Sequence, residues 1–117
     1  EDIAMILPAV ALRGMTILPG MIAHFDISRE ISIKAVEESM RDEQRIFLVT
    51  QRNVEQSNPG LEDLYNIGVI AEIKQVIKLQ NDIVRILVEG NERAELLKFT
   101  PEPAFLEAEI VTCKTKD

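Results

Sequence analysis

Histidine and cysteine are the residue types most often used as metal ligands and nucleophiles, and this chain has one of each, His24 and Cys113. A zinc site needs three or four such donors close together, so the sequence predicts no metal site. His24 could serve as a general base, but it stands between Ala23 and Phe25 in an apolar stretch, with no neighbouring serine or cysteine to activate. We therefore expect His24 to be a structural or surface residue.

Two pairs of adjacent carboxylates, Glu37-Glu38 and Glu62-Asp63, are the other candidates for acid–base chemistry. Neighbouring residues on a helix point apart, and a pair in a polar loop is usually solvated. The five glycines are scattered along the chain, and none opens a phosphate-binding loop that ends in Gly-Lys-Ser or Gly-Lys-Thr. The sequence predicts a domain without catalytic residues and without a nucleotide or other cofactor of its own.

Apolar side chains in a loop are the feature that points to binding. Met15, Ile17, Leu18, Pro19 and Met21 crowd a segment whose Pro19-Gly20 pair predicts a turn. Exposed apolar patches mark interaction sites, and methionine adapts to varied partners. Two interpretations stay open at this point: the loop folds back as a lid on the core, or it presents a polypeptide-binding surface.

A second candidate surface lies at the end of a long predicted strand. Residues 67–79 alternate between apolar and polar types, with Val69, Ala71, Ile73, Ile77 and Leu79 on one face. A strand of about thirteen residues exceeds the usual five or six. Ile77 and Leu79 therefore either extend the core or project beyond it as further polypeptide-binding residues.

Strands are the main elements that must hold these residues, and they are predicted over residues 6–14, 21–27, 45–51, 67–79, 83–88, 93–99 and 105–111. Asn and Asp tolerate left-handed backbone angles, so Gln80-Asn81-Asp82 predicts a hairpin turn. Gly90 predicts a bend or bulge, because glycine is indifferent to the sign of φ. Pro8 is expected at the first residue of the first strand, where its missing N–H costs no hydrogen bond.

One amphipathic helix is predicted, from an N-cap at Ser28 to about Glu43. Ile33, Val36 and Met40 recur at helical spacing and should form its apolar face. The apolar run that follows, at residues 45–51, is expected to be a strand buried on both faces.

Length and charge narrow the function classes further. A chain of 117 residues predicts one domain, over residues 1–117, with 112–117 as the start of a linker. Because the chain does not begin with Met, we expect it to be a fragment of a larger chain. The net charge of −7 argues against binding to nucleic acid or to an anionic membrane. No apolar run approaches the roughly 18 residues of a membrane span. A single cysteine agrees with a reducing compartment, so the cytoplasm is the expected location.

An ordered set of short motifs is similar to a known family: Leu7-Pro8 before Leu12-Arg13, Ile17-Leu18-Pro19-Gly20-Met21, Ser28-Arg29-Glu30, Ile46 to Gln51, Asp63-Leu64-Tyr65 before Gly68-Val69, and Val88-Glu89-Gly90 before Arg93-Ala94. From about Ile6 to Val111, the chain resembles the N-terminal domain of Lon-type ATP-dependent proteases. The resemblance implies an α+β, mainly β fold: a PUA-like pseudobarrel of about six strands with one main helix. Many members carry glycine in the hairpin turn, where this chain has Asn81-Asp82, so the type of turn stays open.

The same resemblance implies a substrate-recognition role within a homo-hexameric serine protease of protein quality control. The ATP-binding motifs and the serine–lysine dyad of that family lie further along the polypeptide, so the fragment should neither hydrolyse ATP nor cut peptides. We expect it to bind unfolded or damaged polypeptides. Two alternatives remain: a subunit-assembly module of the same protease, or a free-standing Lon-domain adaptor or regulator.

Overall fold

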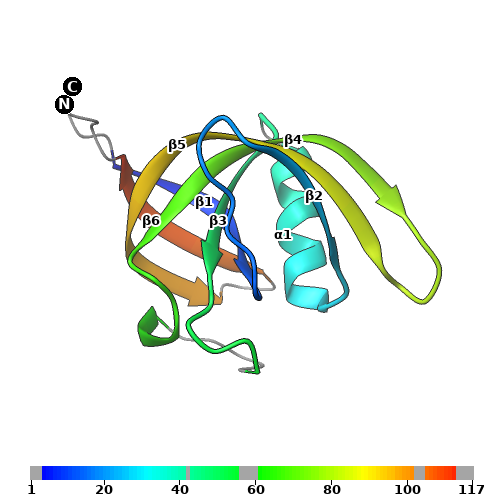
Figure 1. Ribbon diagram of the computed structural model, residues 1–117, viewed down its shortest axis with the longest axis horizontal. Helices are drawn as coiled ribbons and strands as arrows, with labels where there is room; N and C mark the ends of the chain where they lie inside the picture. Colours follow the sequence, from blue (N-terminus) through cyan, green and yellow to red (C-terminus); the bar gives the residue numbers. More distant parts are fainter. Residues whose placement is uncertain (1–3, 42, 56–60, 102–104, 113–117) are drawn as a thin grey trace.

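The computed structural model describes residues 4–41, 43–55, 61–101 and 105–112. Within these ranges the elements follow the order β1 (Ala4–Leu12), β2 (Ile22–Ile27), α1 (Glu30–Met40), β3 (Arg45–Thr50), the 3-10 helix η1 (Leu61–Asp63), β4 (Ile67–Lys78), β5 (Val84–Pro101) and β6 (Leu106–Thr112) (Figure 1). The predicted class, mainly β with about six strands and one main helix, is confirmed. Residues 93–99, predicted as another strand or as a bent extension of the strand at 83–88, are part of one continuous strand with it, β5.

The six strands form one sheet that closes on itself. Their order is β2-β5-β4-β3-β1-β6, and β6 also pairs with β5. Five strands therefore make the ring, and β2 adds to it beside the first half of β5. All pairings are antiparallel except that of β1 with β3, which is parallel and is bridged by β2 and α1.

Pro8 lies in the middle of β1, and the prediction that it begins the strand is wrong. Residues 4–8 of β1 pair with β6, and residues 9–12 pair with β3. The proline stands at the point where β1 changes partner, which is where one missing N–H disturbs neither ladder.

At the other end of the chain, Thr112 is the last residue of β6, so the first residue of the predicted linker belongs to the sheet. Residues 113–117, Cys113 among them, lie outside the described residues.

Strand β5 is paired along both edges. Strand β4 pairs with one edge of β5, from Val84 to Glu95. On the other edge, β2 pairs with residues 84–89 and β6 with residues 94–101. Between the part of β5 that pairs with β2 and the part that pairs with β6, the loop before β2 bonds to Gly90. Gly20 N–H donates to the Gly90 carbonyl, and Gly90 N–H donates to the Met21 carbonyl, both at 2.8 Å.

Gly90 is required by this close approach of the loop. A Cβ atom at position 90 would collide with the carbonyl oxygen of Leu18. The predicted bulge is present, since Ile70 pairs with Glu92 and Ala71 with Gly90. The predicted reason for it is wrong, because the glycines with positive φ among the described residues are Gly14 and Gly20.

The β4–β5 hairpin ends in a tight two-residue turn. Asn81 and Asp82 have φ angles of 63° and 59°, and Ile83 N–H donates to the Gln80 carbonyl at 3.4 Å. Positive φ at both central residues defines a type I′ turn, which Asn and Asp tolerate without glycine. The hairpin is confirmed, and its turn type is now assigned.

The core has two parts, on opposite faces of β1 and β3. Val10, Leu12, Ile46 and Leu48 point to one side, where they pack with residues of α1, β2 and the β4–β5 hairpin. The alternate residues of β1 and β3 point to the other side, where they pack with residues of β5 and β6; they are Ala9, Ala11, Phe47 and Val49. The prediction that the strand at 45–51 is buried on both faces is confirmed for its centre, residues 46–49.

Helix α1 begins one residue later and ends earlier than predicted. Its N-cap is Arg29, whose side chain makes no capping bond, and its last residue is Met40. Glu43 has a φ of 56°, which excludes it from a right-handed helix. The buried stripe consists of Ser32, Ala35, Val36 and Ser39. The predicted apolar face is therefore wrong at Met40, which is 40% exposed.

The Arg29 side chain joins the start of α1 to the ends of two strands. Its Nη2 donates to the Ala11 carbonyl at 2.8 Å and to Gln51 Oε1 at 3.1 Å. Gln51 N–H in turn donates to the Leu12 carbonyl at 2.8 Å. Partial burial, and secondarily the nearby Arg13 guanidinium, lower the pKa of Arg29 from its usual value, and a group with so high a reference pKa stays charged.

We predict that Gly90→Ala destabilises the protein by about 1–3 kcal/mol, the usual cost of overpacking. The Cβ atom must displace the Leu18 carbonyl. Urea unfolding measures the change, and hydrogen exchange at the Gly20 amide should lose protection. Asn91→Ala, at an exposed neighbouring position, is the control and should change stability by less than about 0.5 kcal/mol. Unchanged stability and protection in Gly90→Ala would contradict the role given to the loop.

Arg29→Met should also destabilise the fold, by about 1–3 kcal/mol, because it leaves the Ala11 carbonyl and the Gln51 side chain without this donor. Arg13→Met is the matched control, because Arg13 is exposed and carries the same charge. Its expected change is below about 0.5 kcal/mol. Equal unfolding midpoints for the two variants would show that the Arg29 bonds do not hold α1 in place.

Candidate polypeptide-binding surface

The loop between β1 and β2 is held firmly on the barrel. Thr50 Oγ1 donates to the Met15 carbonyl at 2.8 Å and lies 3.2 Å from Thr16 Oγ1. Beyond this point, Met21 N–H donates to the Leu18 carbonyl at 3.0 Å, and Gly20 has a φ of 82°. With Pro19 at its second position, the segment 18–21 is a type II turn. The turn predicted from Pro19-Gly20 is confirmed.

The loop both covers the core and exposes apolar side chains. Ile17 is 4% exposed and belongs to the core, and Met15 packs partly against that core. Leu18 is 48% exposed, Met21 is 38% exposed, and Pro19 is also exposed. Each of the two open interpretations thus fits part of the loop: Met15 and Ile17 are its anchors, and the other three predicted residues face outward.

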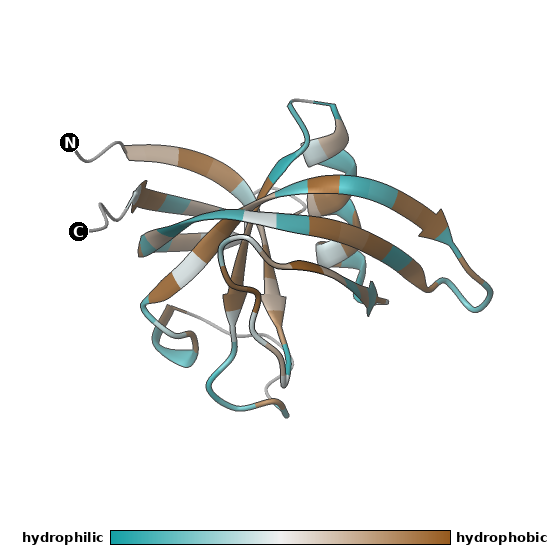
Figure 2. Ribbon diagram, turned by 45° about the horizontal axis from the view of Figure 1, so that its top comes forward, coloured by the Kyte–Doolittle hydropathy of each residue, from teal (hydrophilic) through white to brown (hydrophobic). Residues whose placement is uncertain are grey.

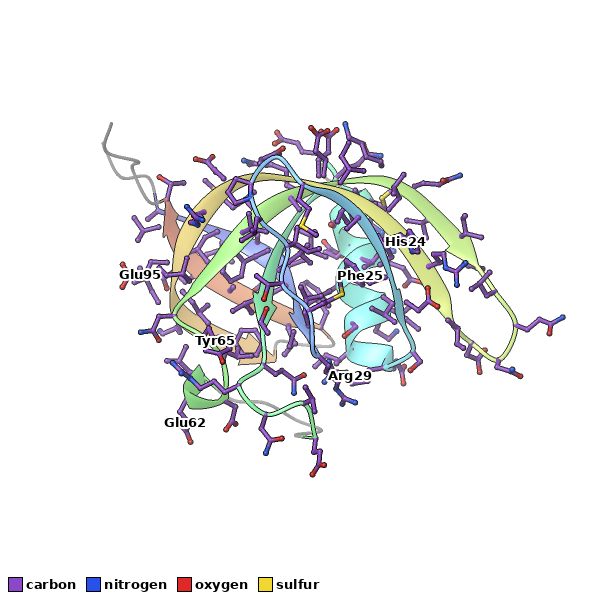
Figure 3. All side chains as sticks on the ribbon, in the orientation of Figure 1. His24, Phe25, Arg29, Glu62, Tyr65 and Glu95 are labelled. Atoms are coloured by element: carbon purple, nitrogen blue, oxygen red, sulfur yellow. The ribbon has the colours of Figure 1, made fainter. Side chains whose placement is uncertain are left out.

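Ile22 is an exposed apolar residue that the sequence interpretation missed. It is 65% exposed at the start of β2, beside the turn. Alternation along β2 could have identified it, because Ile22 shares its parity with the exposed His24 and not with the buried Phe25. His24 and Phe25 lie on opposite sides of the strand (Figure 3). We call Leu18, Pro19, Met21 and Ile22 together the loop patch.

The end of the β4–β5 hairpin exposes Ile77 and Leu79, at 41% and 38%. The prediction that both share the core face of Val69, Ala71 and Ile73 is wrong. A register shift between Ile73 and Gln75 reverses the alternation, so that Val76 packs against the core and Ile77 lies beside Arg85. Figure 2 shows apolar stretches reaching to the end of this projecting hairpin.

The structure does not join the hairpin end to the loop patch. Ile22 pairs with Glu89 and Ile77 with Arg85, four residues apart along β5, which is about 13 Å at the rise of a strand. Charged side chains surround both. Lys74 Nζ lies 3.2 Å from Glu72 and 3.3 Å from Glu89. An extended polypeptide of about four residues would be needed to touch both surfaces.

A bidentate ion pair lies on the same outer face, beside Ile77. Arg85 Nε donates to Asp26 Oδ1 at 2.8 Å, and Arg85 Nη2 donates to Asp26 Oδ2 at 3.1 Å. The bonds from Arg85 lower the pKa of the Asp26 carboxyl, and the bond to Glu72 is the largest cause of the raised pKa of Lys74. These groups are therefore charged at neutral pH, and they separate the apolar surfaces from one another.

The carboxylate pairs considered from the sequence lie in α1 and in η1. Glu38 pairs with Arg41 at 3.5 Å on the outside of α1, and Glu62 is exposed in η1. Among the residues that the structure describes, no three His, Cys, Asp or Glu side chains come together as a metal site. In the same part of the chain, no helix is long and apolar enough to cross a membrane.

Comparison with known proteins connects this architecture to one family. Residues 6–117 match the family model of the ATP-dependent protease La (LON) substrate-binding domain. The chain is 47% identical over 106 residues to the Lon protease of Lachnoclostridium phytofermentans and 48% identical over 104 residues to that of Clostridioides difficile. These alignments cover 91% and 89% of this chain but about 13% of each relative's length.

Solved structures show the same fold. The N-terminal domain of the Mycobacterium avium complex Lon protease superposes with a TM-score of 0.76 at 19% identity, covering 97% of this chain and 57% of that one. A Lon N-terminal domain protein from Xanthomonas campestris superposes with a TM-score of 0.72 at 12% identity, covering 97% and 62%. Sequence and fold agree, and the chain belongs to the family of Lon protease substrate-binding domains.

Proposed function

We propose that this domain captures unfolded or damaged polypeptides for an ATP-dependent serine protease, and that the loop patch is its principal contact surface. The observation that carries the proposal is a type II turn, fixed to β5 by backbone bonds, that exposes Leu18 and Met21 beside Ile22. A surface held in place in advance loses little conformational entropy when it binds. The family name, with its reference to substrate binding, supports the same role.

The chemistry of the surface suits segments that a folded protein would hide. Each half-exposed Leu, Met or Ile side chain contributes roughly 0.5–1.5 kcal/mol when a partner covers it, since full burial is worth about 1.5–3 kcal/mol. The loop patch has three such side chains and Pro19, which give only a few kcal/mol, while association costs at least about 4 kcal/mol. One copy should therefore bind weakly, and several copies in a ring should raise the effective affinity through multivalency.

In this proposal the domain contributes recognition, and the rest of the longer protein contributes ATP hydrolysis and peptide cleavage. A homo-hexamer in the cytoplasm is the setting that best fits weak, repeated contacts with misfolded chains. The net charge of −7 favours polypeptide clients over nucleic acid, whose phosphates the domain would repel. The hairpin end, with Ile77 and Leu79, would then be a secondary contact for longer extended segments.

We predict that Leu18→Ser weakens binding of an unfolded protein by about three- to tenfold, because it removes up to roughly 1.4 kcal/mol of apolar contact. Leu97→Ser is the matched control: it removes a leucine of similar exposure, 45%, from a distant part of β5. Fluorescence anisotropy of the 117-residue chain with a labelled, permanently unfolded protein measures both. Binding of the unfolded form should persist at high salt, whereas the folded form should not bind.

Three results would count against the proposal. Equal affinities for Leu18→Ser and Leu97→Ser would remove the loop patch from the contact surface. Binding that disappears at high salt would show that charge, and not apolar contact, drives the association. No binding of the unfolded protein at any concentration tested would favour the alternative role in subunit assembly.

A further inference from the structure

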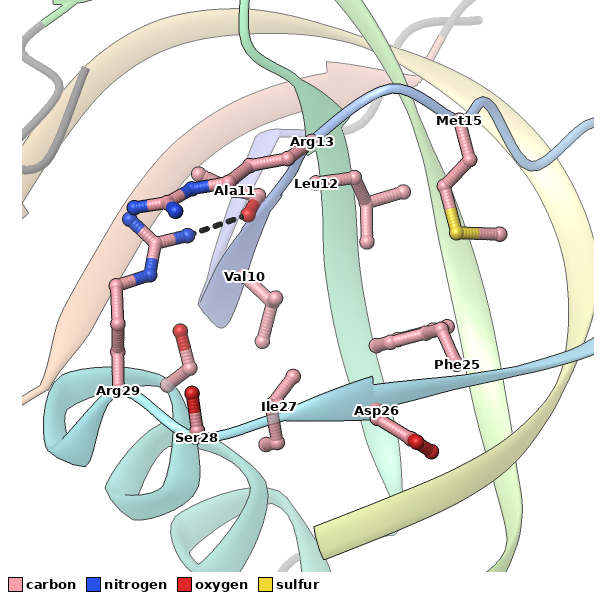
Figure 4. Close-up of a pocket in the computed structure, with 11 residues that line it drawn as sticks. Val10, Ala11, Leu12, Arg13, Met15, Phe25, Asp26, Ile27, Ser28 and Arg29 are labelled. Atoms are coloured by element: carbon pink, nitrogen blue, oxygen red, sulfur yellow. Dashed lines mark hydrogen bonds between the residues drawn. The ribbon is translucent and has the colours of Figure 1, made fainter. Parts of the chain in front are cut away.

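A hollow of about 180 Å³ lies between the end of β1, the end of β2 and the start of α1 (Figure 4). Its apolar wall is formed by Val10, Leu12, Met15, Phe25 and Ile27. An enclosed apolar cavity of about 150 Å³ is large enough for a benzene molecule. The hollow therefore has room for one large apolar side chain, and it is separate from the loop patch on the outer face.

One end of the hollow is polar. Arg13 and Arg29 stand close to each other at this end, while Met15 and Phe25 lie at the opposite end (Figure 4). Ser32, in the first turn of α1, also lines the hollow and is 1% exposed. Its hydroxyl has no hydrogen-bond partner among the described residues. Buried hydroxyls in proteins nearly always have a partner, so an unpaired one beside an open hollow points to a ligand that supplies it.

The polar end carries two guanidinium groups, those of Arg13 and Arg29. Asp26, the acidic residue of the lining, has its carboxylate engaged by two bonds from Arg85. Arg29 is held in a fixed position by the Ala11 carbonyl and Gln51 Oε1. Two neighbouring guanidinium groups beside a helix N-terminus favour an anion, in a chain whose net charge is −7. A ligand that fits this hollow therefore has an anionic end and an apolar side chain.

We propose that the hollow binds the C-terminal residue of a polypeptide that ends in a large apolar residue. The α-carboxylate lies at the polar end, where Arg13 binds it, Arg29 adds positive charge and the Ser32 hydroxyl donates to it. The terminal side chain packs among Met15, Phe25 and Leu12. This inference rests on the proposed function, because it specifies which part of a client polypeptide is recognised.

The position of β2 connects the hollow with the loop patch. Strand β2 runs from Ile22, in the loop patch, to Ile27, in the wall of the hollow. Five residue steps in a strand span about 17 Å. A client whose last residue occupies the hollow therefore needs at least about five further extended residues to pass around β2, at the end of the strand order, and reach the loop patch. The two surfaces together would recognise an unfolded C-terminal tail.

The first test compares two ten-residue peptides that both end in leucine, one with a free carboxylate and one with a C-terminal amide. The 117-residue chain should bind the free acid at least about tenfold more tightly, since bonds to charged groups are worth about 1.5–3 kcal/mol. Replacing the terminal leucine by aspartate should abolish binding. Equal affinity for acid and amide overturns the proposal, and so does equally tight binding of acetyl-leucine, which would assign the hollow to small carboxylates.

Three variants locate the site. Arg13→Met should remove the preference for acid over amide, and Arg41→Met, the same charge change at the far end of α1, should leave it intact. Ser32→Ala should weaken free-acid binding at least about threefold while stability stays equal or rises, because an unpaired buried hydroxyl is removed. A purely structural serine would instead lose stability without any change in affinity, which would overturn its assignment.

Failure of this inference would be distinguishable from failure of the proposed function. If the loop patch binds unfolded protein but the hollow binds no C-terminus, Leu18→Ser still weakens the anisotropy signal, and amidation of the client has no effect. If both surfaces act, amidation and Leu18→Ser each weaken binding of the same client, and the double change weakens it further.

Discussion

The need to hydrogen-bond both edges of β5 governs the arrangement of the loop, the hairpin and the barrel. A buried backbone group without a partner costs about 1–3 kcal/mol, so the buried part of this strand of eighteen residues needs partners on both edges. Strand β4 covers one edge as far as Glu95, while β2, the loop and β6 divide the other. The loop can fill its share only because residue 90 is glycine, which lets the Leu18 carbonyl approach the strand.

The exposed apolar turn follows from that constraint. Once its backbone is bonded to Gly90 and its side chain at Ile17 is buried, the loop has no freedom to turn Leu18 and Met21 inward. These two side chains face solvent because the barrel fixes the turn that carries them, although the core has room for their neighbour Ile17. The walls of the hollow are also held in place, since Arg29 ties α1 to the ends of β1 and β3. Both candidate contact surfaces are thus built on rigid elements.

The sequence predicted the elements and the turns well, because those depend on neighbouring residues. Alternation and turn chemistry indicated the strands, the Pro19-Gly20 turn and the hairpin. The face of the sheet on which each residue lies was harder to predict, because it depends on the register of strand pairing. One bulge near Gln75 moves Ile77 from the expected core face to the outer face. The burial of Ile17 depends on a contact with a distant strand. The hollow could not be predicted at all, because its wall combines two stretches of the chain, 10–15 and 25–32, and its signal, the unpaired Ser32 hydroxyl, exists only in three dimensions.

The pairing of the first strand with the last has a consequence for how the protein is made. Ala4 pairs with Val111, so β1 must wait for the last strand before its antiparallel ladder can form. At a synthesis rate of about 5–20 residues per second, the wait for those roughly 100 residues is on the order of 5–20 seconds. During that time one edge of β1 remains a template for other strands. Such long-range pairing also slows folding. A domain that we propose to bind unfolded chains is therefore itself exposed, as it emerges from the ribosome, to the same kind of misassembly.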